Sequence, residues 1–192
     1  MGIRHLPVSV KMPMKDEKKA AMNHDRPTVT FKGRPVILVG NCVQVGEQAP
    51  DFIAADHDLS PVPFSTFLGR PCIISSIVSV DTEVCDAQTR RFNEEAAALN
   101  KELQILTISM DLPFAQQRWC AAKGVKRITM LSDYRDACFG TSYGLLIKGL
   151  RLLARAVFAV DAGGRLTYKE IVSEITNEPD YDKLLDAARR LA

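Results

Sequence analysis

One stretch of the sequence, residues 72–109, constrains the fold more than any other. It begins with the run CIISSIVSV, whose β-branched and apolar residues are typical of a buried strand over residues 72–80. Apolar residues such as Phe92 and Leu99 then recur every three or four positions, which predicts a helix from about residue 83 to 101. The run LQILTISM predicts a second buried strand. A strand, a helix and a strand in this order predict a parallel pair within an α/β sheet.

The segments on either side of this unit complete the predicted fold. The run TVTFKGRPVILVG predicts a β-hairpin, and RAVFAVDAGGRLTYKEIV predicts a second hairpin that turns at DAGG. The last run, EPDYDKLLDAARRLA, predicts an amphipathic helix. This order predicts a thioredoxin-like α/β domain over residues 27–192, with a central mixed β-sheet flanked by helices and an N-terminal β-hairpin. Residues 1–26 mix charges, prolines and methionines without any period, and we expect them to form a disordered tail.

Composition and charge exclude several classes of protein. The chain has 46% hydrophobic and 25% charged residues, which is typical of a soluble globular domain with a substantial core. A formal net charge of +2 is too small to indicate a nucleic-acid partner. No apolar stretch approaches the roughly 20 residues that a membrane span requires. Because charges and prolines interrupt the first residues, we expect neither a signal peptide nor a membrane association, and predict a cytoplasmic protein.

The cysteines provide the first functional indication. There are five, an odd number, and no two of them form a CxxC motif. This pattern argues against a secreted disulfide scaffold, a zinc ribbon and a dithiol redox loop. In a reducing cytoplasm, any disulfide would therefore be transient and part of a reaction cycle.

Cys85 lies at the junction of the first predicted strand and helix. It precedes Phe92 by seven residues, so it shares the inner face of the helix and lies in the first turn. Free N–H groups and the positive end of the helix dipole favour a thiolate at this position. The alternative is a small buried hydrophobic residue. Thr82 lies three residues earlier, so its hydroxyl can either point at the sulfur or cap the helix.

Cys120 and Arg155 are two further candidates. Cys120 belongs to a short helix predicted between Pro113 and Gly124, on a polar face near the surface. A disulfide requires Cα atoms within roughly 7 Å, so Cys85 and Cys120 can join only if a helix partly unwinds. Such a pair of thiols suits peroxide reduction, although two unrelated structural thiols are the alternative. Arg155 begins a predicted apolar strand, where its charge either faces an anion or is solvated.

Four stretches resemble the bacterial thiol peroxidase family, the atypical two-cysteine peroxiredoxins. They are DTEVCDAQTRRFNEEAAALN, LTISMDLPFAQQRWCAAKG, LLARAVFAVD and SEITNEPDYDKLLDAA. The resemblance runs from about residue 28 to the C-terminus, and the DLPFAQxRxC pattern is highly specific. It implies a thioredoxin fold, a homodimer, and reduction of hydrogen peroxide and organic hydroperoxides at the expense of thioredoxin, with no metal, flavin or haem cofactor.

The resemblance also implies roles for individual residues. Cys85 corresponds to the peroxidatic cysteine, which becomes a sulfenic acid, and Cys120 to the resolving cysteine, which forms a disulfide with Cys85 in the same chain. Thr82 matches the threonine of the active site, and Arg155 matches the arginine that steadies the thiolate and the peroxide oxygens.

Other positions depart from the family or match no function in it. The family pattern has proline where this chain has Val78, and commonly glycine where it has Glu83. Cys42, Cys72 and Cys138 match no functional position, and we interpret them as structural or incidental.

Two alternatives to a peroxidase stay open at this point. One is a redox sensor or binding module without turnover on the same fold, which the departures at Val78 and Glu83 make conceivable. The other is a cysteine-dependent hydrolase. All three histidines precede Cys85, whereas a Cys–His hydrolase usually takes its base from a later position, so the sequence supports hydrolysis poorly.

Overall fold

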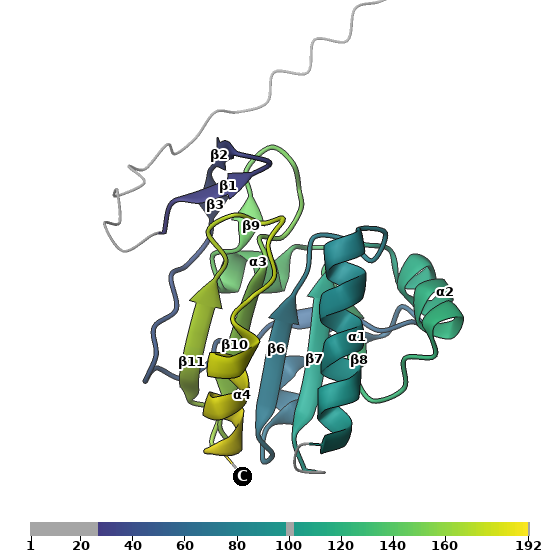
Figure 1. The fold of residues 1–192 in the computed structure, drawn as a ribbon, viewed down its shortest axis with the longest axis vertical. Helices are drawn as coiled ribbons and strands as arrows, with labels where there is room; N and C mark the ends of the chain where they lie inside the picture. Colours follow the sequence, from purple (N-terminus) through teal and green to yellow (C-terminus); the bar gives the residue numbers. More distant parts are fainter. Residues whose placement is uncertain (1–26, 99–101, 192) are drawn as a thin grey trace, which may run out of the picture.

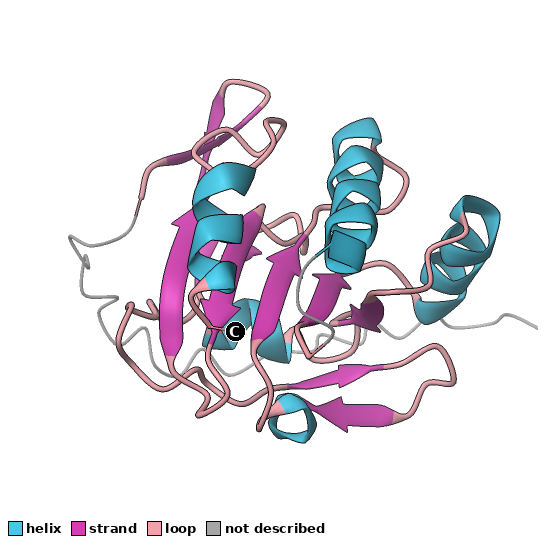
Figure 2. Ribbon diagram, turned by 60° about the horizontal axis from the view of Figure 1, so that its bottom comes forward, coloured by secondary structure: helices cyan, strands magenta, loops and turns pink. Residues whose placement is uncertain are grey.

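The computed structural model describes residues 27–98 and 102–191, and its centre is a seven-stranded mixed sheet (Figures 1 and 2). The strands follow the order β11-β10-β6-β7-β8-β4-β5. Their bounds are β4 Ile53–Ala55, β5 Pro61–Pro63, β6 Cys72–Ser76, β7 Gln104–Ser109, β8 Thr129–Ser132, β10 Ala156–Val160 and β11 Leu166–Ile171. The predicted thioredoxin-like architecture is confirmed.

The predicted strand–helix–strand unit is present at the centre of this sheet. Strands β6 and β7 pair in parallel, with Ile74 opposite Leu106, and β8 continues the parallel set beside β7. Helix α1 (Glu83–Ala98) makes the crossover between β6 and β7. Strand β10 pairs antiparallel with both β6 and β11, which makes the sheet mixed. The predicted inner-face position Leu99 and the predicted helix end near residue 101 lie outside the described residues.

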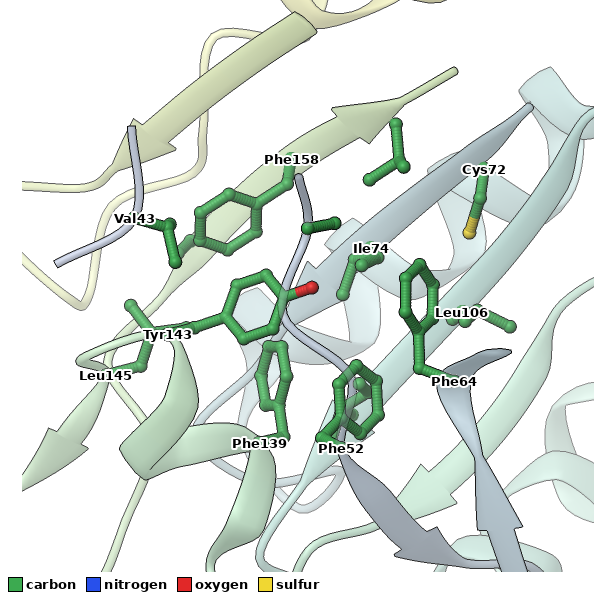
Figure 3. Close-up of a cluster of buried hydrophobic side chains, with 14 of the residues drawn as sticks. Val43, Phe52, Phe64, Cys72, Ile74, Leu106, Phe139, Tyr143, Leu145 and Phe158 are labelled. Atoms are coloured by element: carbon green, nitrogen blue, oxygen red, sulfur yellow. The ribbon is translucent and has the colours of Figure 1, made fainter. Parts of the chain in front are cut away.

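The sheet separates two hydrophobic layers because neighbouring strand residues face opposite sides. On one face, Ile73 packs with Phe92 of α1 and with the last helix, α4 (Tyr181–Arg189). On the other face, Ile74 packs with the aromatic cluster of Figure 3, which includes Tyr143. The inner residues of α4 are those that the amphipathic pattern predicts: Tyr181, Leu184, Leu185 and Ala188.

Short elements close the end of the sheet where β6 and β7 finish (Figure 1). The predicted N-terminal hairpin is present, and it turns at Lys32 and Gly33, which both have positive φ (52° and 72°), as a tight hairpin turn requires. The remaining elements are β1 Val29–Phe31, β2 Arg34–Val36, β3 Leu38–Val39, β9 Leu146–Ile147, the 3₁₀-helix Phe64–Phe67, α2 Pro113–Lys123 and α3 Cys138–Ser142. No helix in the described part of the chain has both the length and the apolarity to span a bilayer.

One predicted boundary is wrong, and the difference matters for the site. The apolar run predicts a strand over residues 72–80, whereas β6 ends at Ser76. The Ile77 amide still donates to the Ile108 carbonyl of β7 at 3.0 Å, and the chain then leaves the sheet. There the Asp111 carboxylate accepts hydrogen bonds from the Ser79 hydroxyl and the Val80 amide, both at 2.8 Å. The apolar residues of this loop are nevertheless buried, as Val78 is only 6% exposed. Apolar composition therefore identified burial correctly but not strand pairing.

Candidate active site

Cys85 lies in the first turn of α1, directly above the end of β6. The amide of Asp86 donates to the Thr82 carbonyl at 3.0 Å, so the helix begins as soon as the loop leaves the sheet. The Cys85 side chain is fully buried, in a cluster that includes Val78 and Trp119. The predicted position of Cys85 on the inner helix face is confirmed, and its sulfur lies near the helix N-terminus, where backbone N–H groups favour an anion.

Arg155 makes the contact that distinguishes Cys85 from an ordinary buried thiol. Its Nη2 donates to Cys85 Sγ at 3.3 Å, and its Nε donates to the Ile175 carbonyl at 2.8 Å. Arg155 directly precedes β10 and is only 1% exposed, so it is buried rather than solvated at a strand end. Within the described residues, no carboxylate forms an ion pair with it. Because a buried charge requires hydrogen-bond partners, the guanidinium depends on Cys85 Sγ and the Ile175 carbonyl for its stabilisation.

Gln88 is a site residue that the sequence reasoning missed. It lies one turn after Cys85 and is fully buried. Its Oε1 accepts a hydrogen bond from Arg155 Nη1, while its Nε2 donates to Ser75 Oγ of β6 at 2.8 Å. Gln88 thereby fixes the guanidinium plane against Cys85. The signal in the sequence is a polar residue on the inner face of an otherwise apolar helix, three positions after the cysteine.

Thr82 directly precedes α1, and its hydroxyl is hydrogen-bonded to a backbone carbonyl of the preceding loop. Thr82 Oγ1 donates to the Ser79 carbonyl at 3.1 Å, and the Thr82 amide donates to the same oxygen at 3.2 Å. These bonds close the turn before α1, and the side chain is exposed. The structure thus brings Cys85 and Arg155 into contact but does not bring the Thr82 hydroxyl to Cys85, and its part in catalysis stays a prediction.

Cys120 lies on α2, which begins at Pro113 and ends where Gly124 adopts a left-handed conformation (φ 66°). The thiol is half-buried against the cluster that contains Cys85 and Trp119, and no disulfide joins it to Cys85. Burial raises the pKa of the Cys120 thiol above its usual range. The sequence pattern also places Gln116 on the same polar helix face as Cys120. This prediction is wrong, because Gln116 is buried and donates to Ser109 Oγ and to the Leu131 carbonyl.

The two helices that carry the cysteines, α1 and α2, lie next to each other in Figure 1, and an ion pair joins them. Lys123 Nζ of α2 lies 3.1 Å from Asp86 Oδ1 of α1. Beside this ion pair is a hollow of about 240 Å³, whose lining includes Thr82, Glu83 and Trp119. On the other side of α2, a groove of about 670 Å³ between α2, β8 and the β4–β5 hairpin is lined in part by Cys120. Cys120 is therefore reachable from a groove, whereas Cys85 is enclosed.

The other three cysteines have different surroundings. Cys72 is fully buried in the aromatic cluster of Figure 3, and burial raises the pKa of its thiol well above the usual range. Cys42 and Cys138 are partly buried and lie outside the cluster around Cys85. Among the described cysteines, Cys85 alone accepts a hydrogen bond from a cationic side chain.

Replacing Arg155 by methionine should slow the reaction of Cys85 with hydrogen peroxide. The variant loses the cation that donates to the sulfur, and a hydrogen bond to a charged group contributes about 1.5–3 kcal/mol, which corresponds to a rate about 10- to 100-fold lower. Stopped-flow fluorescence of Trp119, the sole tryptophan, measures this rate. Arg165→Met is the matched control, because it removes an exposed arginine that directly precedes β11. Equal rates in the two variants would reduce Arg155 to a structural residue.

The fold and this buried thiol–guanidinium pair define a redox-active domain of the thioredoxin-like class. Comparison with known proteins supports this assignment to the thioredoxin-like class. The Redoxin family model matches residues 44–185. The chain is 54% identical to the thiol peroxidase of Halalkalibacterium halodurans over 162 residues, which cover 84% of this chain and 97% of that protein. It is also 54% identical to the thiol peroxidase of Bacillus subtilis over 163 residues (85% and 97%).

Solved structures agree with the sequence comparison. A peroxiredoxin-like protein from Aquifex aeolicus superposes with a TM-score of 0.81 at 37% identity and covers 87% of this chain and 98% of that one. A thiol peroxidase from Chromobacterium violaceum shares the fold with a TM-score of 0.74 at 24% identity, over 86% and 98% of the two chains. The chain therefore belongs to the Redoxin family and, within it, to the thiol peroxidases, which confirms the resemblance found in the sequence.

Proposed function

We propose that this protein reduces hydrogen peroxide and organic hydroperoxides, with Cys85 as the nucleophile. The observation that carries the proposal is the 3.3 Å hydrogen bond from the buried Arg155 guanidinium to Cys85 Sγ at a helix N-terminus. The thiolate attacks one peroxide oxygen, the O–O bond breaks, and the sulfur is oxidised to a sulfenic acid. The other oxygen leaves with the electron pair of that bond and takes a proton, which gives water or an alcohol.

Cys120 is proposed as the resolving thiol. Its sulfur attacks the Cys85 sulfenic acid, a disulfide forms within the chain, and the hydroxyl group leaves as water. The ion pair between Asp86 and Lys123 and the packing of Trp119 hold α1 and α2 together in the reduced state, so α2 has to unwind in part for this step. Unwinding exposes Cys120 and removes the burial that keeps its thiol protonated.

Thioredoxin is the proposed reductant. A dithiol of this kind transfers two electrons by thiol–disulfide exchange and restores both cysteines. The groove beside Cys120 supports an approach to that sulfur rather than to the enclosed Cys85. A transient disulfide and five free thiols are consistent with a reducing, cytoplasmic setting.

A homodimer is part of the proposal as well. The resemblance to the family implies it, and the start of α2 offers apolar surface that a second copy could cover. Leu112 is 52% exposed and Phe114 is 58% exposed, both beside the segment that carries Cys120. We also propose that residues 27–192 form the catalytic domain; the tail predicted over residues 1–26 lies outside the described residues.

Steady-state consumption of hydrogen peroxide in the presence of thioredoxin, its reductase and NADPH tests the function. The enzyme should oxidise many equivalents of NADPH per protein chain. A single equivalent followed by arrest would instead indicate a redox sensor without turnover. Hydrolysis of an activated ester that survives blocking of the thioredoxin system would favour the hydrolase alternative.

A further inference from the structure

The carboxylate of Asp111 holds the loop that leads into the Cys85 helix. Its Oδ1 accepts from the Ser79 hydroxyl at 2.8 Å, and its Oδ2 accepts from the Val80 amide at 2.8 Å. Ser79 is in turn the residue whose carbonyl receives both hydrogen bonds from Thr82, directly before α1. The position of the first turn of α1, and hence of Cys85, therefore depends on this carboxylate.

The same carboxylate is connected to the helix that carries Cys120. Asp111 Oδ2 also accepts from Ser109 Oγ at 2.7 Å, and Ser109 Oγ accepts from Gln116 Nε2 at 2.9 Å. Gln116 is buried on α2, one helical turn before Cys120. Asp111 itself directly precedes Leu112, the N-cap of α2, and its carbonyl accepts from the Ser132 hydroxyl of β8. One side chain thus joins the starts of the two cysteine-bearing helices.

We propose that Asp111 is a positioning residue that couples the two cysteine segments, an inference that rests on the proposed function. Attack on peroxide needs the first turn of α1 in place, so that Cys85 meets Arg155. Formation of the disulfide needs α1 and α2 to depart from this arrangement. Asp111 therefore accelerates the first step and retards the second.

Loss of the carboxylate should change the two rates in opposite directions. In Asp111→Ala, oxidation of Cys85 by one equivalent of hydrogen peroxide should be about tenfold slower, and formation of the Cys85–Cys120 disulfide about tenfold faster. The variant loses the three hydrogen bonds that the carboxylate accepts from Ser79, Val80 and Ser109, and a tenfold change in each rate corresponds to a part of their combined contribution. General loosening of the fold would instead slow both steps or leave their ratio unchanged.

The conservative variant distinguishes hydrogen bonding from charge. In Asp111→Asn, the amide oxygen can take the place of Oδ2 and accept from Val80 and Ser109, while the amide NH₂ donates to a rotated Ser79 hydroxyl. Both rates should therefore return to within about twofold of the wild-type values, since these contacts persist. Ser79→Ala removes the hydrogen bond to Asp111 Oδ1 and the one that Ser79 Oγ accepts from the amide of the exposed Asp81. Because the contacts of Asp111 with Val80 and Ser109 persist, both rates should shift in the same directions as in Asp111→Ala but by less.

Stopped-flow fluorescence of Trp119 and quenched mass spectrometry measure the two rates on the full chain. Asp161→Ala is the matched control, because Asp161 accepts from the Arg165 amide in the β10–β11 turn and should affect neither rate. Two rates that fall together in Asp111→Ala, an asparagine variant that behaves like alanine, or no shift in Ser79→Ala would each overturn the inference. Failure of wild-type Cys85 to react with peroxide would overturn the proposed function first, and this inference with it.

Discussion

Cys85→Ser should abolish peroxide reduction, both in the steady state with thioredoxin and in a single turnover. A serine hydroxyl at this position is neither ionised at neutral pH nor a nucleophile toward a peroxide oxygen, and Arg155 cannot compensate. The fold should survive, because oxygen replaces sulfur in a side chain that still has the Arg155 guanidinium as a hydrogen-bond donor. Peroxide consumption should fall to the rate measured without protein.

Cys42→Ser provides the matched control for this variant. Cys42 is a partly buried thiol outside the cluster around Cys85, so its replacement should leave turnover unchanged. Residual thioredoxin-dependent turnover in Cys85→Ser, at more than a tenth of the wild-type rate, would show that another cysteine is the nucleophile. The thermal unfolding temperature of both variants should match that of the wild-type protein, which shows that a loss of activity is not caused by a loss of structure.

Cys120→Ser should separate the two chemical steps. The first reaction with peroxide should proceed at nearly the wild-type rate, because Cys85, Arg155 and Gln88 are untouched. Turnover with thioredoxin should nevertheless collapse, since the sulfenic acid no longer has a partner thiol. A sulfenic-acid trap such as dimedone should therefore label Cys85 stoichiometrically in this variant and only weakly in the wild-type protein.

The pair of variants assigns the roles without ambiguity. Excess peroxide should drive Cys120→Ser further, to the sulfinic acid of Cys85, whereas the wild-type protein is protected by disulfide formation. If Cys120→Ser loses the first, fast oxidation to the same extent as Cys85→Ser, then the peroxidatic and resolving roles are wrongly assigned.

Much of the fold could be predicted from the sequence because its signals are local. Continuous runs of apolar and β-branched residues and helix periodicity located the central strand–helix–strand unit, and Pro113 and Gly124 marked the ends of α2. Cys85 could be assigned to the inner face of α1 for the same reason. The extent of the strand after Cys72 was predicted less well, because apolar residues indicate burial and not pairing.

The parts of the site that depend on distant contacts could not be predicted in this way. Contact between Arg155 and Cys85 brings together residues 70 positions apart, and nothing local indicates that the guanidinium is buried. The burial of Gln116 depends on Ser109 and Leu131, which neighbouring strands supply. The direction of the Thr82 hydroxyl depends on how the preceding loop turns. Residue pattern left Arg155 either facing an anion or solvated, and the resemblance to the thiol peroxidases favoured the first alternative.

The central claim is that Cys85 and Cys120 are the redox pair of one chain. Peptide mapping by mass spectrometry after treatment of the reduced protein with one equivalent of hydrogen peroxide tests it most directly. We expect one disulfide, between Cys85 and Cys120, in a protein that runs as a single chain under denaturing, non-reducing conditions. A disulfide from Cys85 to Cys42, Cys72 or Cys138, or one that links two chains, would contradict the account.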